Sequence, residues 1–391
     1  MNILVLTAYP PVLHMHGGGV RMYHNIRILA ESHSVRVISF IENEDERERL
    51  RSLEGVCESV TAVRRIPDFR PHWLSLAPFL VREFSTPQMY EAVEAAIRKK
   101  RVDVLQCEYL QMAQFHRPDV FSVLTIHETL SANAYETFQN ERDPRTRFKL
   151  FYRWMQMLRY EVLMTRRFDR VVTMTEHDAS YLRSYVPGGD IRAIPIGADP
   201  GEFEPFPEDN ERPLEVLFVG NFRHSPNVEA AEFLVREAAP YFRSLKFVLP
   251  GNDVPPRLKR ESNLVFPGYI ATTKLLYRRP NTIVAAPLFS GTGQRVKLLE
   301  AFSMACPVIT TTVGALGFPV RHGEEALIAD TPEEFRAALQ QLVASEQLRR
   351  DLGTKARAMI LRDFDWRVIG PRMLNVVQTR NTRHNRRGAE K

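Results

Sequence analysis

Cysteine is scarce in this chain, and the few cysteines lie too far apart to form a framework. Of 391 residues only three are cysteines, Cys57, Cys107 and Cys306, and no two of them form a CxxC pair. This spacing excludes a disulfide-rich fold and the usual zinc-binding patterns. It is typical of a protein in a reducing compartment, so we expect a cytoplasmic protein.

Long apolar runs and a basic leader are also missing. No apolar run approaches the roughly 20 residues that span a bilayer. The first residues, MNILVLTAYPP, are expected to enter a strand directly rather than to form a signal peptide. Zinc-finger spacing, an RNP-like sequence and internal repeats are absent, so nucleic acid is not an expected partner. The formal net charge of +6 then points to a nucleotide or a phospholipid surface.

The chain does contain apolar segments that alternate with helical patterns. With 44% apolar residues, its length suits two domains of ordinary size. Continuous apolar runs are typical of strands that are covered on both faces, as in a parallel sheet. Such strands are expected over residues 2–7, 35–40, 102–106, 120–126, 170–175, 216–219, 246–249 and 283–286. Their alternation with helices predicts an α/β fold with parallel sheets.

Several helices have clear signals at their ends. Thr86-Pro87 heads a helix to about residue 97, and Ser225-Pro226 heads one to about residue 238. The sequence Thr331-Pro332-Glu333-Glu334 has the pattern of a capping box for a helix to about residue 342. A further helix is expected from about Val296 until Pro307 ends it.

A glycine run near the N-terminus precedes another helix. Gly17, Gly18 and Gly19 are expected to form a turn before a helix from about Val20 to Ala30. The run is not GxGxxG, so the fingerprint of a dinucleotide-binding fold is absent. As a plain turn, three glycines need only their conformational freedom.

A second glycine-rich stretch, residues 286–317, is the most informative part of the chain. Ser290–Gly293 supplies a tight turn that leads into a helix. Such a turn offers free backbone N–H groups to an anion, and the basic residues Arg295 and Lys297 follow it directly. Glu300 comes about one turn later. Alternatively, the glycines serve chain geometry alone and Glu300 is a surface residue of the helix.

This stretch resembles the donor-site signature of retaining GT-B glycosyltransferases of the glycogen-synthase-like family, that is, glycosyltransferase family four or glycosyl transferases group 1. Residues 291–297 fit the family branch that reads G-[ST]-G-x-R-x-K-x-L-E-A, and further matches are Glu300, Ala301, Ala305, Pro307, Val308 and Gly314. The family's first glutamate is missing, since Thr292 stands at its nominal position. The resemblance implies the GT-B fold, in which two Rossmann-like domains with parallel sheets face each other across a cleft.

The resemblance also implies which residues bind the donor. They are Gly18, Gly19, Asn221, Arg223, Gly291, Thr292, Gly293, Gln294 and Glu300. Glu300 would accept charge-assisted hydrogen bonds from both ribose hydroxyls. Gly18 and Gly19 would lie in a loop that closes over the donor phosphates, and Arg223 with His224 stands near the family's altered arginine–lysine pair. Because the first glutamate normally contacts the transferred sugar, Thr292 leaves the identity of the sugar open.

Three side chains are candidates for catalysis, namely His127, Arg295 and Lys297. His127 follows an expected strand at its carboxyl end, where parallel α/β sheets bind ligands. In the family, the histidine there lines the sugar site, although a lone histidine can also be structural. Arg295 and Lys297 would neutralise the departing diphosphate. The resemblance implies a front-face mechanism in which the leaving phosphate helps to deprotonate the acceptor hydroxyl, without a metal or another cofactor.

The domain break is expected in residues 195–213, which are rich in proline, glycine and acidic residues. Residues 1–197 would form an acceptor-side domain, and residues 198–366 would form the donor-binding domain. A helix over about residues 367–391 would cross back onto the first domain, and its basic end is expected to be a frayed tail.

Two segments combine basic and aromatic residues as interfacial helices do. They are residues 70–84, which include Trp73 and Phe79, and residues 145–167, which include Phe148, Phe151 and Trp154. The same pattern suits ordinary helices that pack one face on a core. Contact with an anionic membrane surface and packing within the protein are therefore both open.

Together these features predict a retaining hexosyltransferase in polysaccharide biosynthesis. It would move a hexose from a nucleotide-diphosphate sugar to a hydroxyl of a glycan or a lipid-linked acceptor, either in the cytoplasm or peripherally on the cytoplasmic face of a membrane. One alternative is a sugar-nucleotide epimerase on the same fold, which would need more acid–base groups in the cleft than His127. Another is a non-catalytic nucleotide-sugar-binding scaffold, which Thr292 and the altered lysine favour.

Overall fold

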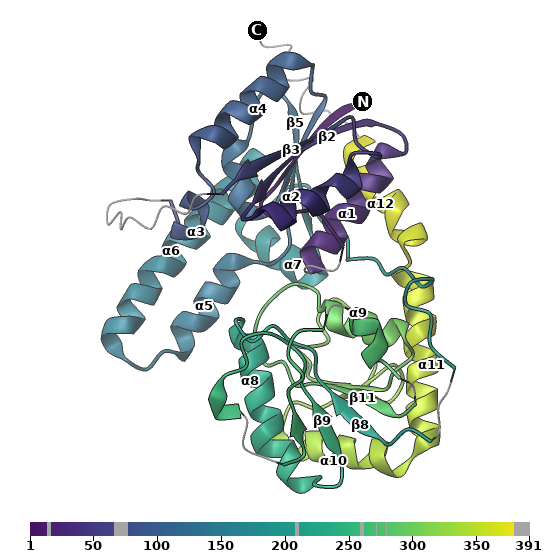
Figure 1. Ribbon diagram of the computed structural model, residues 1–391. Helices are drawn as coiled ribbons and strands as arrows, with labels where there is room; N and C mark the ends of the chain where they lie inside the picture. The colour runs from purple at the N-terminus through teal and green to yellow at the C-terminus, as the bar shows by residue number, and fades with distance from the viewer. Residues whose placement is uncertain are drawn as a thin grey trace. The chain divides into compact units, whose positions relative to one another are not determined.

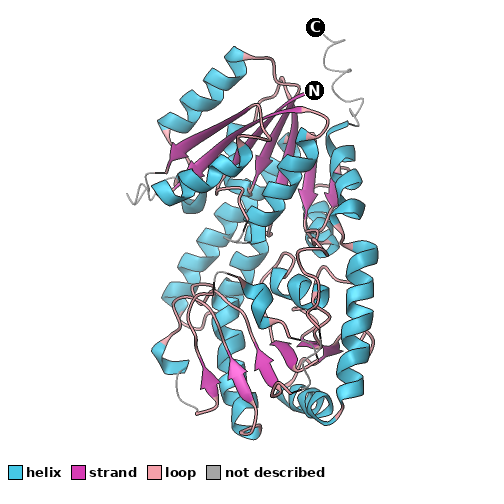
Figure 2. Ribbon diagram, turned by 45° about the vertical axis from the view of Figure 1, so that its right-hand side comes forward, coloured by secondary structure: helices cyan, strands magenta, loops and turns pink. Residues whose placement is uncertain are grey.

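The computed structural model describes residues 1–13, 17–65, 77–207, 211–258, 262–270, 272–278 and 280–378. The chain divides into two compact units, the first formed by Met1–Pro195 with the segment that begins at Ile369, and the second by Ile196–Val368. Each unit is a parallel sheet with helices on its faces (Figures 1 and 2). The predicted α/β fold with two parallel sheets is confirmed, and the division falls next to the predicted boundary after residue 197.

Seven described strands form the sheet of the first unit, in the order β3-β2-β1-β4-β5-β6-β7. Their bounds are β1 Asn2–Thr7, β2 Ser34–Ile41, β3 Ser59–Arg64, β4 Val104–Glu108, β5 Phe121–Ile126, β6 Arg170–Thr173 and β7 Ile191–Ala193. The prediction for β4 was two residues early at its start and its end. Asp103 precedes the strand, and its carboxylate accepts the backbone N–H of Asn2 over 2.8 Å. Pairing with β1 runs from Val104 to Glu108.

The helices of the first unit are α1 Gly17–Ala30, α2 Glu44–Leu50, α3 Phe79–Arg82, α4 Pro87–Lys99, α5 Leu130–Asn140, α6 Pro144–Arg167 and α7 Glu176–Tyr185. The glycine run is not a turn before a helix, because Gly17–Gly19 are the first turn of α1. The aromatic part of the predicted interfacial segment 70–84 that includes Trp73 lies outside the described residues.

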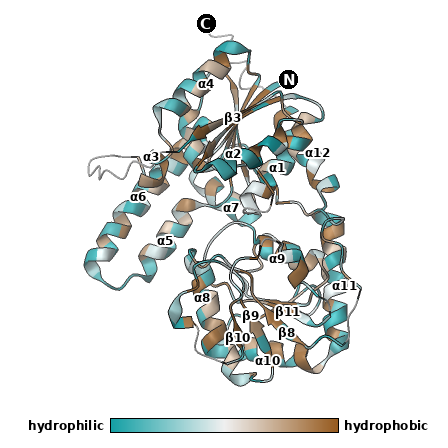
Figure 3. Ribbon diagram, viewed as in Figure 1, coloured by the Kyte–Doolittle hydropathy of each residue, from teal (hydrophilic) through white to brown (hydrophobic). Residues whose placement is uncertain are grey.

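Six described strands form the sheet of the second unit, in the order β10-β9-β8-β11-β12-β13. Their bounds are β8 Glu215–Leu217, β9 Lys246–Val248, β10 Leu264–Val265, β11 Thr282–Ala286, β12 Val308–Thr310 and β13 Leu327–Ile328. The central strands of both sheets are hydrophobic and buried (Figure 3), as expected for sheets covered on both faces. The edge strand β3 differs, since Ser59, Thr61 and Arg64 are exposed.

The helices of the second unit are α8 Ser225–Phe233, α9 Val296–Ser303, α10 Pro332–Ala344 and α11 Glu346–Asp363. The capping box of α10 is confirmed, since the Thr331 hydroxyl and the Glu334 carboxylate both accept backbone N–H groups. The prediction that Ser225 caps α8 was wrong: His224 is the capping position, and the Ser225 hydroxyl donates to Glu229 within the helix.

Helix α9 ends four residues before the proline that was expected to end it. Its last residue is Ser303, and Ala305 then takes a positive φ of 54°. Gly353 of α11 makes this turn possible, because a Cβ atom at that glycine would lie 2.0 Å from the Ala305 carbonyl oxygen. The end of α9 agrees with the predicted stop at Pro307, since a proline ring excludes a helical carbonyl four residues earlier, at Ser303.

The last described helix, α12 Trp366–Gln378, joins the second unit to the first. From Ile369 onward it belongs to the first unit, where the buried guanidinium of Arg170 donates to the backbone carbonyls of Asn375 and Val376. Arg372 of the same helix donates to the Ala193 carbonyl over 2.8 Å. These bonds attach α12 to the edge of the sheet at β6 and β7.

Candidate functional site

The glycine turn between β11 and α9 depends on two left-handed residues. Gly291 and Gly293 have φ angles of 91° and 78°, a backbone conformation that residues with a Cβ atom rarely adopt. The guanidinium of Arg295 closes the turn, because it donates to the carbonyls of Ser290, Gly291 and Thr292 at 3.1, 2.7 and 2.6 Å. Arg295 therefore holds the turn in shape, a role that the sequence did not predict.

Lys297 links this turn to the loop that follows β8. Its ammonium donates to the Asn227 side-chain oxygen over 2.6 Å and lies 4.3 Å from the centre of the Phe218 ring. Asn227 in turn donates to the Asn221 carbonyl over 2.8 Å. Burial, and then the charge of Arg295, lower the pKa of Lys297 to about 7. A bound anion would favour the charged form of this lysine.

Glu300 lies on the same helix and is partly buried, so the alternative of a surface residue is wrong. Its Oε2 atom accepts from the Thr273 hydroxyl at 2.9 Å and from the Tyr277 hydroxyl at 3.1 Å. Burial raises the pKa of Glu300 to about 7, although these two hydrogen bonds act in the opposite direction. Both bonds from described residues end on Oε2, which leaves Oε1 to meet a ligand.

The other predicted donor residues have different surroundings. Gln294 is buried, and its side-chain oxygen accepts the backbone N–H of Ile196 over 2.6 Å. Arg223 is exposed and pairs with Asp253 over 2.7 Å. Its backbone N–H donates to the Asn221 side chain over 3.0 Å. The structure thus brings the turn at residues 290–293, Lys297 and the Asn221 loop together, whereas Gln294 and Arg223 have partners of their own within the second unit.

The first unit holds a second polar cluster around His127. This residue directly follows β5, at the carboxyl end of the sheet, as predicted. Its ring stacks on Tyr109 with the ring centres 3.9 Å apart and the planes inclined by 4°. Tyr109 has a φ angle of 75°, unusual for an aromatic residue, which turns the chain sharply after β4.

Gly18 of α1 approaches this stack closely. A Cβ atom at Gly18 would lie 1.8 Å from the Tyr109 hydroxyl oxygen and 3.3 Å from Nδ1 of His127. Only glycine fits there without movement of the partly buried Tyr109 ring. The resemblance assigned Gly18 to the donor site, and the contact that the structure shows is with Tyr109 and His127 of the same unit.

Glu108 is the partner of His127, and sequence reasoning missed it. The Glu108 carboxylate lies 2.8 Å from Nε2 of His127, and both side chains are buried. A signal did exist: Gln106 and Glu108 are polar residues within an otherwise apolar strand. Two buried polar side chains in a central parallel strand are unusual, because each must find hydrogen-bond partners.

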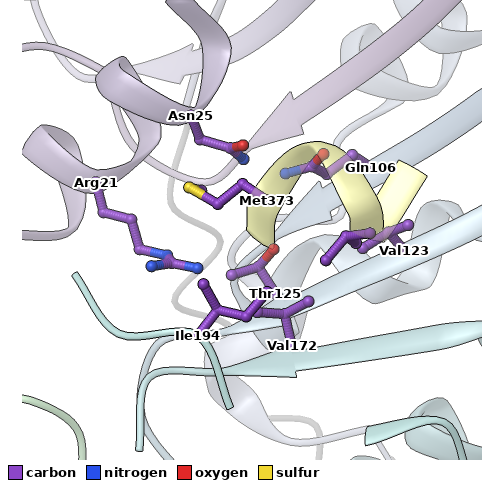
Figure 4. Close-up of a pocket in the computed structure, with 9 residues that line it drawn as sticks. Arg21, Asn25, Gln106, Val123, Thr125, Val172, Ile194 and Met373 are labelled. Atoms are coloured by element: carbon purple, nitrogen blue, oxygen red, sulfur yellow. The ribbon is translucent and has the colours of Figure 1, made fainter. Parts of the chain in front are cut away.

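A small cavity lies beside this cluster (Figure 4). Its lining comes from α1, the central strands, the segment after β7 and α12, and consists of Arg21, Asn25, Gln106, Val123, Thr125, Val172, Ile194, Met373 and Val376. Arg21 is 1% exposed and donates to the Pro195 carbonyl over 2.7 Å. Burial lowers the pKa of Arg21 to about 10, so its guanidinium is charged at neutral pH. The cavity therefore contains a fixed positive charge close to Glu108.

Within the described parts of the chain, no group of three or more histidine, cysteine, aspartate or glutamate side chains is arranged to hold a metal ion. No helix among the described residues is long and apolar enough to cross a membrane.

Both halves of the chain match glycosyltransferase families. Residues 15–202 match Glycosyltransferase Family 4, and residues 213–345 match Glycosyl transferases group 1. These matches support a GT-B glycosyltransferase that uses a nucleotide-sugar donor. A curated relative from Klebsiella pneumoniae, an uncharacterised 44.6 kDa protein in the cps region, is 21% identical over 389 residues, which cover 93% of this chain and 96% of the relative.

Solved glycosyltransferase structures share the fold. Sucrose-phosphate synthase from Thermosynechococcus elongatus has a TM-score of 0.73 and 19% identity, with full coverage of both chains. Anabaena HepE in complex with UDP and glucose has a TM-score of 0.68 and 16% identity, covering 97% of this chain and 100% of HepE. TarM has a TM-score of 0.69 and 11% identity, covering 97% and 99%. At these identities the likeness shows the GT-B fold.

Proposed function

We propose that the protein is a retaining hexosyltransferase that uses a nucleotide-diphosphate sugar and glycosylates a hydroxyl of a glycan or a lipid-linked acceptor. The observation that carries this proposal is the turn at residues 290–293 with Lys297 and Glu300 on the helix that follows it. The cps-region relative supports a place in polysaccharide biosynthesis, and we assign the reaction to the cytoplasmic side.

The second unit would bind the nucleotide. Lys297, near the loop after β8, would stabilise the diphosphate as its charge develops during departure. Arg295 would contribute a nearby positive charge while it holds the turn. Glu300 would accept hydrogen bonds from the ribose through Oε1, since Thr273 and Tyr277 hold Oε2 in place. This scheme needs no metal ion, because lysine and arginine supply the positive charge.

The first unit would contribute His127 beside the transferred sugar, at the end of β5. In a front-face reaction the leaving phosphate takes the proton of the acceptor hydroxyl, and no carboxylate nucleophile is required. The family resemblance supports this stereochemistry. Thr292 in place of the family's first glutamate leaves the sugar itself open, so a panel of sugar nucleotides is needed to find it.

Calorimetry with UDP, GDP and ADP tests the donor site, beginning with UDP, the nucleotide present in the HepE structure. Glu300→Gln is expected to weaken binding of the preferred nucleotide by roughly 1.5–3 kcal/mol, because a charged acceptor for two hydroxyls is lost. Glu325→Gln is a matched control, since Glu325 is a buried glutamate of the same unit that pairs with Arg321.

Absence of binding to all three nucleotides would refute the donor site. Release of sugar from a sugar nucleotide, or transfer to an added glycan, separates a transferase from a scaffold, which would bind without turnover. Conversion of the sugar nucleotide into an epimer without release of the nucleotide would instead support the epimerase alternative.

We also propose that the helical hairpin formed by α5 and α6 contacts an anionic membrane surface. The two helices lie side by side (Figure 1), and an aromatic cluster of Tyr135, Phe138, Phe151 and Trp154 joins them. Several large apolar side chains of α6 are exposed: Phe148 by 73%, Phe151 by 41%, Tyr152 by 45% and Met155 by 43%.

The charge of α6 suits an anionic lipid surface. The helix carries Arg145, Arg147, Lys149, Arg153, Arg159, Arg166 and Arg167, and its one acidic residue is Glu161. Glu161 is buried and binds the backbone at Leu130 and Ser131, so it does not offset the exposed positive charge. Exposed rings flanked by basic side chains are the features of interfacial helices.

A further inference from the structure

Glu108 occupies a position where an unpaired carboxylate would be costly. It is the last residue of β4, pairs with Thr125 of β5 in the sheet and is 1% exposed. Burying a charge inside a sheet is unfavourable unless hydrogen-bond donors surround it. The groups around Glu108 therefore show which donors stabilise its charge and which side chains it orients in return.

The donors around Glu108 are divided between its two oxygens. Oε1 accepts from the Asn25 side chain at 3.0 Å, from the Gln106 side chain at 2.5 Å and from the Thr125 hydroxyl at 3.2 Å. Oε2 faces Nε2 of His127 at 2.8 Å. An ionised carboxylate only accepts hydrogen bonds, so Nε2 of His127 must carry the proton.

The pKa shifts of Glu108 and His127 support the same arrangement. Burial alone would raise the pKa of Glu108, but the bond with His127 and the charge of Arg21 outweigh it and hold that pKa below its ordinary value. Burial also lowers the pKa of His127, although Glu108 opposes this effect. The pair is then an ionised glutamate next to a neutral histidine, with Arg21 as the buried counter-charge.

The ring of His127 is fixed in two further ways. Tyr109 stacks on it in an almost parallel orientation. Gly18 lies beside Nδ1, since its absent Cβ would be 3.3 Å from that atom. With Nε2 bound to Glu108, Nδ1 is the nitrogen that faces the first turn of α1.

We propose that Glu108 is a positioning residue that fixes His127 as the Nε2–H tautomer and so leaves Nδ1 as a hydrogen-bond acceptor beside Gly18. The group that meets Nδ1 must then be a donor such as a hydroxyl, because a phosphate oxygen would find a lone pair there. The effect of Glu108 on turnover rests on the proposed transferase function, whereas its effect on the tautomer does not.

Nitrogen NMR of protein labelled with ¹⁵N-histidine measures the tautomer directly. The His127 signals are assigned by their loss in His127→Asn, and the wild-type protein is expected to carry its proton on Nε2. In Glu108→Gln, the three donors around Oε1 keep the amide oxygen on their side and turn the NH₂ group toward His127. Nε2 must then accept, so the proton is expected to move to Nδ1.

Glu161→Gln is the matched control, because Glu161 is a fully buried glutamate of the same unit whose contacts are with Leu130 and Ser131 instead. It should leave the His127 tautomer unchanged. In the transfer or donor-hydrolysis assay, Glu108→Gln is expected to lower kcat by at least about tenfold while nucleotide affinity changes by less than about twofold, as for loss of a correctly oriented imidazole.

A wild-type His127 protonated on Nδ1 would overturn the proposal, and this measurement needs no variant to fold. An unchanged tautomer in folded Glu108→Gln would overturn it as well. A tautomer that switches in a protein whose wild type shows no turnover would support the role of Glu108 and refute the proposed transferase function, so the two failures are distinguishable.

Discussion

Lys297 and Glu300 show how burial prepares single residues for a ligand. Both lie on α9, and burial moves the pKa of each to about 7 from opposite directions. Neither charge is fully compensated by described residues, since Lys297 donates to a neutral amide and Glu300 accepts from two neutral hydroxyls. Strongly shifted pairs of this kind are concentrated at functional sites.

The first prediction concerns pH and Lys297. In a Glu300→Gln background, affinity for the preferred nucleoside diphosphate should fall between pH 7 and pH 9, by up to about tenfold per pH unit. The direction of this pH dependence follows from the lowered pKa of Lys297. Above about pH 7 the Lys297 side chain of the nucleotide-free protein loses its proton, and a neutral amine does not attract phosphate. The substitution at Glu300 removes a group that titrates over the same range with the opposite effect.

Calorimetry at several pH values measures this dependence, in a range where the terminal phosphate is mostly ionised because it loses its last proton near about pH 6. Adding Lys297→Arg to the same background is the control, because arginine remains charged and should flatten the curve. An equally steep decline in the arginine protein would show that another group, and not Lys297, is responsible.

At the level of elements, α1 is shaped by its contact with the Tyr109–His127 stack. Gly→Ala within a helix normally stabilises it by up to about 1 kcal/mol. At Gly18 the new methyl group would meet the Tyr109 hydroxyl oxygen at 1.8 Å, so the ring or the helix must move.

The second prediction is therefore that Gly18→Ala destabilises the protein, by roughly 1–3 kcal/mol as in other overpacked sites. Thermal unfolding measures it. Gly370→Ala is the control, since this helical glycine of α12 has only an ordinary contact, with Ile28 at 3.4 Å from the added Cβ. A Gly18→Ala protein as stable as the wild type would mean that Tyr109 does not confine α1.

The α5–α6 hairpin exposes apolar side chains that a single packed helix would bury. Asp143 caps α6 by accepting the Thr146 N–H over 2.8 Å, and the aromatic cluster between the helices keeps the pair together. Phe148 is 73% exposed, so most of its side chain meets solvent and not the cluster. The packed-helix alternative thus accounts for Trp154 but not for Phe148.

The third prediction is that the protein sediments with anionic liposomes and that salt weakens this binding. Phe148→Ser should reduce the binding by at least about tenfold, because insertion of one large apolar side chain is worth roughly 1.5–3 kcal/mol. Tyr241→Ser serves as the control, since Tyr241 is a 64% exposed aromatic residue of the second unit. If the same amount of protein stays in the supernatant with and without vesicles, the hairpin has a role other than membrane binding. A dimer detected by light scattering would show that this role is self-association.

On the scale of the whole molecule, the predicted groups are divided between two units. His127 belongs to the first unit, and Lys297 and Glu300 belong to the second. Neither unit alone contains both the nucleotide-binding groups and the histidine. The proposed role of His127 can therefore be tested separately from nucleotide binding by the second unit.

The fourth prediction follows from this division. His127→Ala should leave the affinity for the nucleotide within about twofold of wild type and lower turnover by at least about tenfold, or roughly 1.4 kcal/mol in the barrier. Calorimetry and a donor-hydrolysis assay on the same preparation measure both quantities. Nucleotide affinity that falls as far as turnover would contradict the assignment of His127 to the sugar rather than to the nucleotide.

Features that depend on neighbouring residues were predictable from the sequence. Strand β1 has the predicted bounds, the capping box at Thr331 is present, and the parallel α/β architecture is confirmed. Each of these signals lies within a few residues of the element that it specifies, so apolar periodicity and capping chemistry are enough to predict it.

Only the tertiary structure decided which polar groups meet. Glu108 is 19 positions from His127, and Thr273 is 27 positions from Glu300. A buried polar side chain must find its partner among the groups that folding brings beside it, and sequence spacing does not say which they are. The sequence alone therefore determined the fold class and the candidate residues, whereas packing decided that Arg295 holds a turn, that Gly18 lies in the first turn of a helix, and that His127 pairs with a glutamate.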